Sequence, residues 1–171
     1  IEATQPDFYE DTSALEFQAE VLHCIPLTKD MISRLTFSGE VESIPSYAVV
    51  TDRTLFYPEG GGQLGDQGRL LQDGNEYEVL DTKSQDGVIF HFTENPLAPG
   101  KVKGILDWDR RKQLMDHHTA VHIVGGAARN ILGPHIWQAG SNKGARYARL
   151  DITHHSRLTR QEIEAIDCLL Y

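Results

Sequence analysis

The stretch DHHTAVH, residues 116–122, lies in a helical pattern from Asp109 to Leu132 and organises the second half of the chain. In a helix, His118 and His122 project from the same face with about 5–6 Å between their Cβ atoms. This spacing suits paired metal ligands, but a catalytic zinc site has three protein ligands and a structural site has four. The pair alone therefore leaves two interpretations open, half of a zinc site or an ordinary surface pair.

Two further features of this helix restrict its chemistry. Thr119 stands where a HExxH protease has its glutamate, which argues against peptide hydrolysis by that route. Gly125, Gly126 and Arg129 continue the face that carries the histidines. Each glycine costs about 1 kcal/mol relative to alanine in a helix, so we expect another backbone or a ligand to approach this face closely.

The composition limits the function classes. A chain of 171 residues is long enough for one large domain or two small ones, and its net charge of −9 excludes a molecule-wide basic field for nucleic acid. Cys24 and Cys168 are too far apart in sequence to suggest a disulfide framework, which fits a reducing compartment. The sequence contains no apolar run of membrane-spanning length and no signal-peptide pattern, so we expect a soluble cytoplasmic protein.

The first half has the short alternating segments of a β domain. Turn signals separate the expected strands, which cover residues 15–24, 47–51, 68–71, 77–82, 88–92 and 102–107. This pattern predicts a small antiparallel barrel over residues 1–106, with a short helix at residues 28–33; residues 26–45 suggest no function.

From residue 107 the periodicity becomes helical, and we expect an α+β domain over residues 107–171. After the histidine helix, the pattern predicts a compact connection at residues 137–141 and a strand at residues 145–153. Thr159 and Glu162 form a capping-box pattern at the start of a last helix. The chain begins without Met and stops within that helical pattern, so we expect a piece of a longer polypeptide.

A second motif, FYPEGGGQLGDQG, occupies residues 56–68. Its consecutive glycines permit positive φ and allow the backbone to lie against a ligand with its N–H groups free to donate. It is not a Walker loop, because no Gly-Lys-Ser/Thr sequence follows. A turn between strands is the alternative, but it accounts for neither Gln63 nor Asp66.

Together with HHTAVHIVGGAARNILGPHIWQAGS (residues 117–141) and ARLDITH (residues 148–154), this motif resembles the editing region of alanyl-tRNA synthetases, especially the archaeal type, and of AlaX-type editing proteins. The resemblance covers nearly the whole chain. The related threonyl-tRNA synthetase editing domain lacks the barrel with the Gly-Gly-Gly-Gln motif. The resemblance implies a translation-factor-like β-barrel followed by an α+β editing domain that contains zinc.

The resemblance also implies the chemistry. The family hydrolyses Ser-tRNA(Ala) and Gly-tRNA(Ala) after transfer, because an apolar alanine pocket rejects glycine and serine poorly. His118 and His122 match the first half of the zinc site, and the Cys/His ligands are expected beyond Tyr171, with Cys168 a weak substitute. Gln138 and Thr119 are the candidate catalytic residues. The candidate substrate-binding residues are Gly60, Gly61, Gly62, Gln63 and Arg129.

The implied partner is tRNA(Ala) mischarged with serine or glycine. ATP and Mg²⁺ belong to the aminoacylation domain of the parent ligase, and a homodimer would form through a region beyond this chain. Two alternatives stay open, a free-standing AlaX-type deacylase and a non-catalytic tRNA-binding module. We expect His154 and His155 to end a strand rather than act chemically. The candidate phosphate contacts are Arg110, Arg111, Lys112, Arg129, Lys143, Arg146, Arg149, Arg157 and Arg160.

Overall fold

The computed structural model describes residues 1–10, 13–35, 37 and 43–170, and the chain forms two compact units. The first unit comprises Ile1–Gly60 and Leu64–Arg111, and the second comprises Gly61–Gln63 and the chain from Lys112 onward. The sequence did not predict that Gly61–Gln63 would join the second unit. The functional boundary between residues 106 and 107 stays a prediction.

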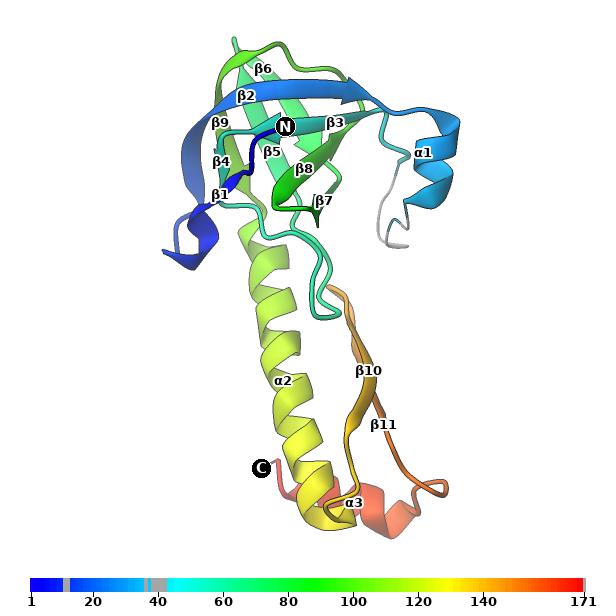
Figure 1. Cartoon of the computed structure of the whole chain (residues 1–171). Helices are drawn as coiled ribbons and strands as arrows, with labels where there is room; N and C mark the ends of the chain where they lie inside the picture. Colours follow the sequence, from blue (N-terminus) through cyan, green and yellow to red (C-terminus); the bar gives the residue numbers. More distant parts are fainter. Residues whose placement is uncertain (11–12, 36, 38–42, 171) are drawn as a thin grey trace. The chain divides into compact units, whose positions relative to one another are not determined.

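The first unit is built on a curled antiparallel sheet of seven strands, shown in Figure 1. The strands lie in the order β6-β5-β9-β2-β3-β8-β7, with β6 and β7 at the edges. Their bounds are β2 (Glu16–Pro26), β3 (Tyr47–Thr51), β5 (Gly68–Gln72), β6 (Asn75–Val79), β7 (Asp81–Gln85), β8 (Val88–Thr93) and β9 (Gly100–Leu106). The sequence thus predicted an antiparallel β domain correctly.

Smaller elements accompany the sheet. The strand β1 (Gln5–Pro6) pairs in parallel with β4 (Arg53–Thr54), and the 3-10 helix η1 (Asp7–Tyr9) follows β1. The short helix α1 (Lys29–Arg34) lies close to its predicted position and is capped by the Thr28 hydroxyl, which accepts from the Met31 N–H. Part of the segment at residues 26–45 lies outside the described residues.

The predicted strand at residues 77–82 is wrong, because the chain changes partners at Leu80. Val79 ends β6, which pairs with β5, whereas Asp81 begins β7, which pairs with β8. Between them, the Leu80 N–H donates to the Phe92 carbonyl at 2.8 Å. The period-two pattern of the sequence continues through this change of pairing partner, so the sequence predicted one strand where the structure has two.

A buried ion pair explains Asp66, which the turn interpretation left unexplained. Its carboxylate accepts from Arg111 Nε at 2.7 Å and from the Tyr57 N–H at 2.6 Å, while Arg111 also donates to the Leu55 carbonyl. Removing one partner of such a buried pair typically costs about 3–5 kcal/mol. Arg111 is therefore a structural residue, and its expected contact with phosphate is wrong.

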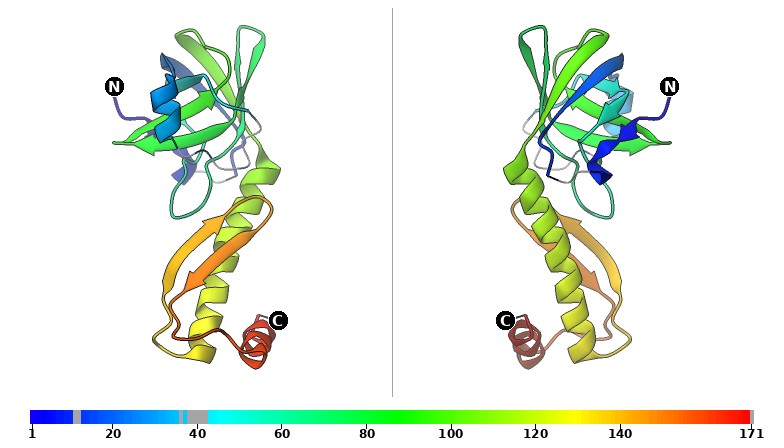
Figure 2. Two further views of the ribbon diagram at one scale, coloured as in Figure 1. Left: turned by 90° about the vertical axis from the view of Figure 1, so that its right-hand side faces the viewer. Right: turned by 90° about the vertical axis from the view of Figure 1, so that its left-hand side faces the viewer.

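The second unit contains a helix, a hairpin and a short last helix. Helix α2 (Trp108–Leu132) begins in the first unit and supplies most of its length to the second. Strands β10 (Gln138–Lys143) and β11 (Ala148–Ile152) form an antiparallel hairpin that lies beside α2 in the views of Figure 2. The predicted compact connection at residues 137–141 is therefore wrong, since β10 begins there. Gly140 and Ser141 hid this strand, because they lack the apolar alternation of a strand.

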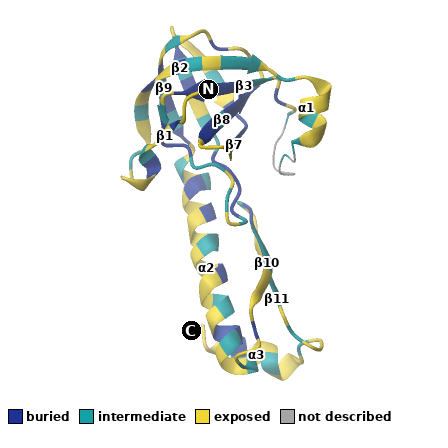
Figure 3. Cartoon of the chain, in the orientation of Figure 1, coloured by how far each residue is buried: buried dark blue, intermediate teal, exposed yellow. Residues whose placement is uncertain are grey.

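Helix α3 (Arg160–Cys168) confirms the capping box, in which Thr159 and Glu162 satisfy each other's backbone N–H groups. A small apolar cluster of Ala127, Ala128, Ile136 and Ile166 packs α2 and α3 together. Figure 3 shows buried, intermediate and exposed positions along α2. In the described part of the chain, no helix has both the length and the apolar character that crossing a membrane requires.

Candidate functional site

The two histidines of the HxxxH motif lie together on α2, as their spacing predicted. Their ring centroids are 5.1 Å apart and the ring planes differ by 21°. The Nδ1 atom of His118 lies 2.9 Å from Oε1 of Gln63. An amide oxygen accepts hydrogen bonds, so Nδ1 is the protonated nitrogen and Nε2 keeps its lone pair. Metal-binding histidines are oriented in this way by a hydrogen bond from the other ring nitrogen.

The glycine loop, residues 60–63, holds Gln63 in this position. Gln63 is buried and forms a parallel β-bridge with Lys143, whose N–H donates to the Gly62 carbonyl at 2.7 Å. Gly61 and Gly62 have φ values of +58° and +79°, and a Cβ atom on Gly62 would lie 2.5 Å from the Ser141 carbonyl oxygen. Close packing against β10 therefore accounts for the glycine at position 62.

Lys143 is the residue of this site that sequence reasoning assigned wrongly. Only 1% of it is exposed, and its Nζ donates to the Gly61 carbonyl at 2.5 Å and to Ser141 Oγ at 2.7 Å. A buried ammonium cannot contact phosphate, so Lys143 instead ties the glycine loop to β10. Recognising the strand β10 in the sequence could have indicated this role, because Ser141 and Lys143 lie two residues apart on a strand and so share one face.

Burial and charge both favour the neutral form of His118. The pKa of His118 is lowered by burial, then by the Lys143 charge and by His122. Burial also lowers the pKa of Lys143. Because neutral imidazole is the form that binds metal, this environment favours ligation at His118.

Next to this pair, a cavity of about 210 Å³ lies between α2 and the hairpin. It is lined by His122, Arg129 and Gln138 among the predicted site residues. The remaining described residues that line it are Val121, Gly125, Gly126, Ile136, Trp137, Leu150 and Ile152. The structure thus brings three of the predicted residues to one hollow.

The two glycines of α2 leave space in this cavity. A Cβ atom on Gly125 would lie 3.6 Å from Leu150, an ordinary contact, and one on Gly126 would meet no described heavy atom within 4 Å. The expected close approach of another backbone is therefore wrong for the described residues. The approach of a ligand to these glycines stays a prediction.

Two polar side chains of the cavity, Arg129 on α2 and Gln138 on β10, contact neighbouring residues. The guanidinium of Arg129 lies 4.0 Å from the centroid of the Trp137 ring and donates to the Ile136 carbonyl at 3.1 Å. Gln138 is exposed, and its Nε2 donates to Ser141 Oγ at 3.2 Å. Gln138 is therefore not a buried amide that serves the loop backbone.

Other residues of the motifs lie elsewhere. Thr119 is exposed and is not among the described residues that line the cavity, and Gly60 belongs to the first unit. His117 uses both ring nitrogens, with the Gly144 carbonyl at 2.6 Å and Gln113 Nε2 at 2.9 Å. His117 is therefore not available as a ligand, and the roles of Thr119 and Gly60 stay predictions.

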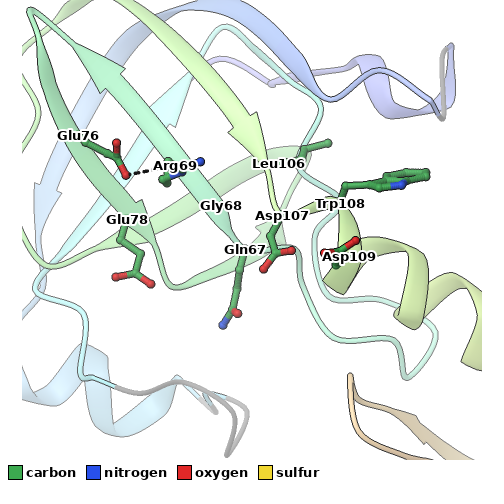
Figure 4. A pocket seen from close by; sticks show the side chains of 9 residues that line it. All are labelled: Gln67, Gly68, Arg69, Glu76, Glu78, Leu106, Asp107, Trp108 and Asp109. Atoms are coloured by element: carbon green, nitrogen blue, oxygen red, sulfur yellow. Dashed lines mark hydrogen bonds and ion pairs between the residues drawn. The ribbon is translucent and has the colours of Figure 1, made fainter.

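A larger hollow of about 620 Å³ lies in the first unit (Figure 4). Four carboxylates line it, from Glu76, Glu78, Asp107 and Asp109, and one of them pairs with Arg69 at 3.0 Å. Such a lining repels phosphate, so size alone does not make it the candidate site for a tRNA substrate.

Comparisons with known proteins agree with the motifs. The family model described as tRNA synthetases class II (A) matches residues 3–110. The alanine–tRNA ligase of Metallosphaera sedula is 50% identical over 143 residues, which are 81% of this chain. Those of Haloquadratum walsbyi and Natronomonas pharaonis are each 44% identical, over 94% and 96% of the chain. The matched region spans 16% of each of these relatives.

Proposed function

The chain belongs to the class II (A) tRNA synthetases, and we propose that it provides the editing site of an alanine–tRNA ligase. The reaction would be hydrolysis of the ester that joins serine or glycine to the terminal adenosine of tRNA(Ala). The whole protein would use ATP and Mg²⁺ to ligate alanine to the same tRNA in the cytoplasm. The archaeal alanine–tRNA ligases that this chain resembles support the choice of alanine.

One observation carries the proposal, the hydrogen bond between His118 Nδ1 and Gln63 Oε1 at 2.9 Å. It joins Gln63 of the Gly-Gly-Gly-Gln motif to His118 of the HxxxH motif within the second unit, although 55 residues separate them. A mere turn between strands would not need its glutamine to orient a histidine. The two motifs would therefore act as parts of a single site.

The residues present fit half of a zinc site. Nε2 of His118 is the free nitrogen, and its neighbour His122 lines the cavity, so both could hold the ion, with the other ligands expected beyond Tyr171. When bound, zinc would supply a Lewis acid that anchors the aminoacyl amine or polarises a water. The Gln63 amide would fix the ring of His118, as outer-shell partners of ligating histidines generally do.

The cavity suits a small aminoacyl group. Its volume of about 210 Å³ lies below the roughly 300–1,000 Å³ typical of drug-sized ligands, and its glycines leave room beside His122. The Gln138 amide would bond the serine hydroxyl, or a water in its place when glycine is bound. Alanine has no hydroxyl for that amide to bond, so serine would gain a hydrogen bond that alanine lacks. Arg129, held against Trp137, would bind the substrate beside it.

The sheet of the first unit would be a translation-factor-like barrel, with the functional boundary at residues 106–107. Its curled antiparallel order supports this assignment. The backbone of the glycines at positions 60–62 would contact the end of the tRNA. Thr119, beside His118, would support the pocket from the neighbouring helix face.

Deacylation assays test the proposal. Seryl-, glycyl- and alanyl-tRNA(Ala) are incubated with this chain and with a chain extended past Tyr171. Each is compared with its His122→Ala variant and with His23→Ala, which removes an exposed histidine of β2 in the first unit. We expect the extended chain to hydrolyse the seryl and glycyl esters, His122→Ala to abolish this activity, and His23→Ala to preserve it.

If the folded extended chain hydrolyses none of the esters, or if His122→Ala is as active as wild type, the proposal is wrong. Binding of tRNA without hydrolysis would then favour the non-catalytic module. Activity of the present chain by itself would favour an AlaX-like arrangement.

A further inference from the structure

Three histidines gather at the base of the hairpin, away from the HxxxH pair in sequence. His135 precedes β10, whereas His154 and His155 follow β11. One nitrogen from each ring lies within 4.8 Å of the corresponding nitrogens of the other two. The ring centroids are 4.4 to 5.7 Å apart. Among the described residues, this is the one group of three or more potential metal ligands.

The hairpin forces this meeting of residues distant in sequence. Gln138 at the start of β10 pairs with Ile152 at the end of β11, so the segments that flank these ends must lie side by side. Thr153 fastens them further, because its hydroxyl donates to the His135 carbonyl at 2.8 Å and accepts from the Trp137 N–H at 2.9 Å. These contacts join the segment that carries His135 to the segment that leads into His154 and His155.

A glycine also leaves room for one of the rings. Gly133 follows the last residue of α2 with a φ of +112°, and a Cβ atom there would lie 3.3 Å from His135 Nδ1. An alanine would need both a strained backbone and a shift of the imidazole. The conformation at the end of the helix thus suits the position of His135.

Hydrogen bonding between imidazoles accounts for only part of this cluster. His135 Nε2 and His154 Nδ1 are 3.0 Å apart, which fits one ring donating to the other. That bond needs two rings and gives no reason for His155 to complete the group. Three neutral imidazoles are, however, a common donor set for Zn²⁺ and related divalent ions.

The distances are close to those of a metal site. Zn–N bonds of about 2.0–2.1 Å place the nitrogens of a tetrahedral site about 3.4 Å apart. The present spacing of at most 4.8 Å thus requires only small side-chain movements. Two of the rings are exposed and one is half-buried, so an ion could enter from solvent with a water as its fourth ligand.

We propose that His135, His154 and His155 form a second metal site, which binds a divalent transition-metal ion such as Zn²⁺. The ion would tie the end of α2 to the segment that leads into α3. The expectation that His154 and His155 do no more than end a strand is replaced by this role. The site shares no ligand with the editing site proposed above, so each can be tested without the other.

Zinc titration tests this inference in a chain that carries His118→Ala and His122→Ala, so that the HxxxH pair cannot contribute. Calorimetry with ZnCl₂ alone measures the stoichiometry and Kd, and NMR of the histidine side chains identifies the ligands. We expect one ion per chain and shifts in the rings of His135, His154 and His155. A further His135→Ala change should weaken binding at least tenfold, whereas His23→Ala should leave the Kd unchanged.

The inference is overturned if no zinc binds at millimolar concentration. It is equally overturned if His135→Ala and His155→Ala each leave the Kd unchanged in chains that circular dichroism shows to be folded. Loss of deacylation in the His122→Ala assay does not affect this result, because the titration measures binding alone.

Discussion

His91 makes the stability of the first unit depend on pH. This residue of β8 is completely buried, and its Nδ1 donates to the Val49 carbonyl at 3.0 Å. Its Nε2 lies 2.8 Å from the Thr54 hydroxyl, which also accepts from the Phe56 N–H. This arrangement gives each nitrogen of a neutral ring a hydrogen-bond partner. A protonated ring would point a second N–H at the Thr54 hydroxyl, which already accepts from the Phe56 N–H.

The magnitude follows from the pKa. Burial lowers the pKa of His91 from 6.5 to about 4, so between these pH values the unfolded chain binds a proton that the folded chain does not. The free energy of unfolding therefore falls as the pH falls through this interval. At roughly 1.4 kcal/mol per pH unit, the loss attributable to His91 reaches about 3 kcal/mol near pH 4.

Urea unfolding at pH values from 7 to 4 measures this effect. A Trp137→Phe background leaves Trp108, at the start of α2, as the fluorescent reporter of the first unit. His91→Asn keeps a donor for the Val49 carbonyl but cannot titrate. We therefore expect the variant to lose about 3 kcal/mol less stability than wild type when the pH falls from 7 to 4.

His23→Asn is the matched control, because His23 is exposed on β2 and should retain the wild-type pH dependence. Equal losses in wild type and His91→Asn would refute the reasoning. They would mean that the ring is protonated in the folded state without cost.

Two further predictions concern the glycine loop. Gly61→Ala should destabilise the second unit by about 1–2 kcal/mol because of its positive φ alone. Gly62→Ala should cost more, because only the Cβ at position 62 meets the Ser141 backbone. Thermal unfolding measures both variants, and equal effects would contradict the packing. Lys143→Met should raise the pKa of His118 in an NMR titration, because the Lys143 charge helps to lower that pKa. The control Lys112→Met should leave it unchanged. An unchanged pKa in Lys143→Met would show that the Lys143 charge does not act on His118.

Elements determined by local sequence were predicted most accurately. The bounds of β3 at Tyr47–Thr51 and the capping box at Thr159 agree with the structure, and α2 begins one residue before its predicted start. In each case the signal, an apolar run, a helical period or a cap, lies within a few residues. Long-range pairing is not needed to identify these elements.

Features that depend on distant partners were missed. The short strand β4 exists because β1 pairs with it across 48 residues, and β10 is a strand because β11 lies beside it. The burial of Lys143 depends on carbonyl and hydroxyl acceptors that include one from the glycine loop, 82 residues away. Charge alone suggested a surface residue there, because sequence does not show which acceptors the fold brings near.

The candidate site shows the same division. Helical spacing placed His118 beside His122, and the glycine motif singled out Gln63, but neither pattern predicted their hydrogen bond. The meeting of His135 with His154 likewise depends on the register of the hairpin. Sequence therefore identified several of the participants, whereas the fold determined their contacts.

The central claim is that the glycine loop and the histidine helix form one editing site. Gln63→Met tests it most directly, in the chain extended past Tyr171, through the rate of seryl-tRNA(Ala) deacylation. Gln67→Met is the matched control, because that amide donates to the Leu80 carbonyl in the first unit. We predict a rate about 10–100-fold lower for Gln63→Met, the usual effect of losing such an outer-shell partner, and an unchanged rate for Gln67→Met. Equal rates for Gln63→Met and wild type would contradict the account.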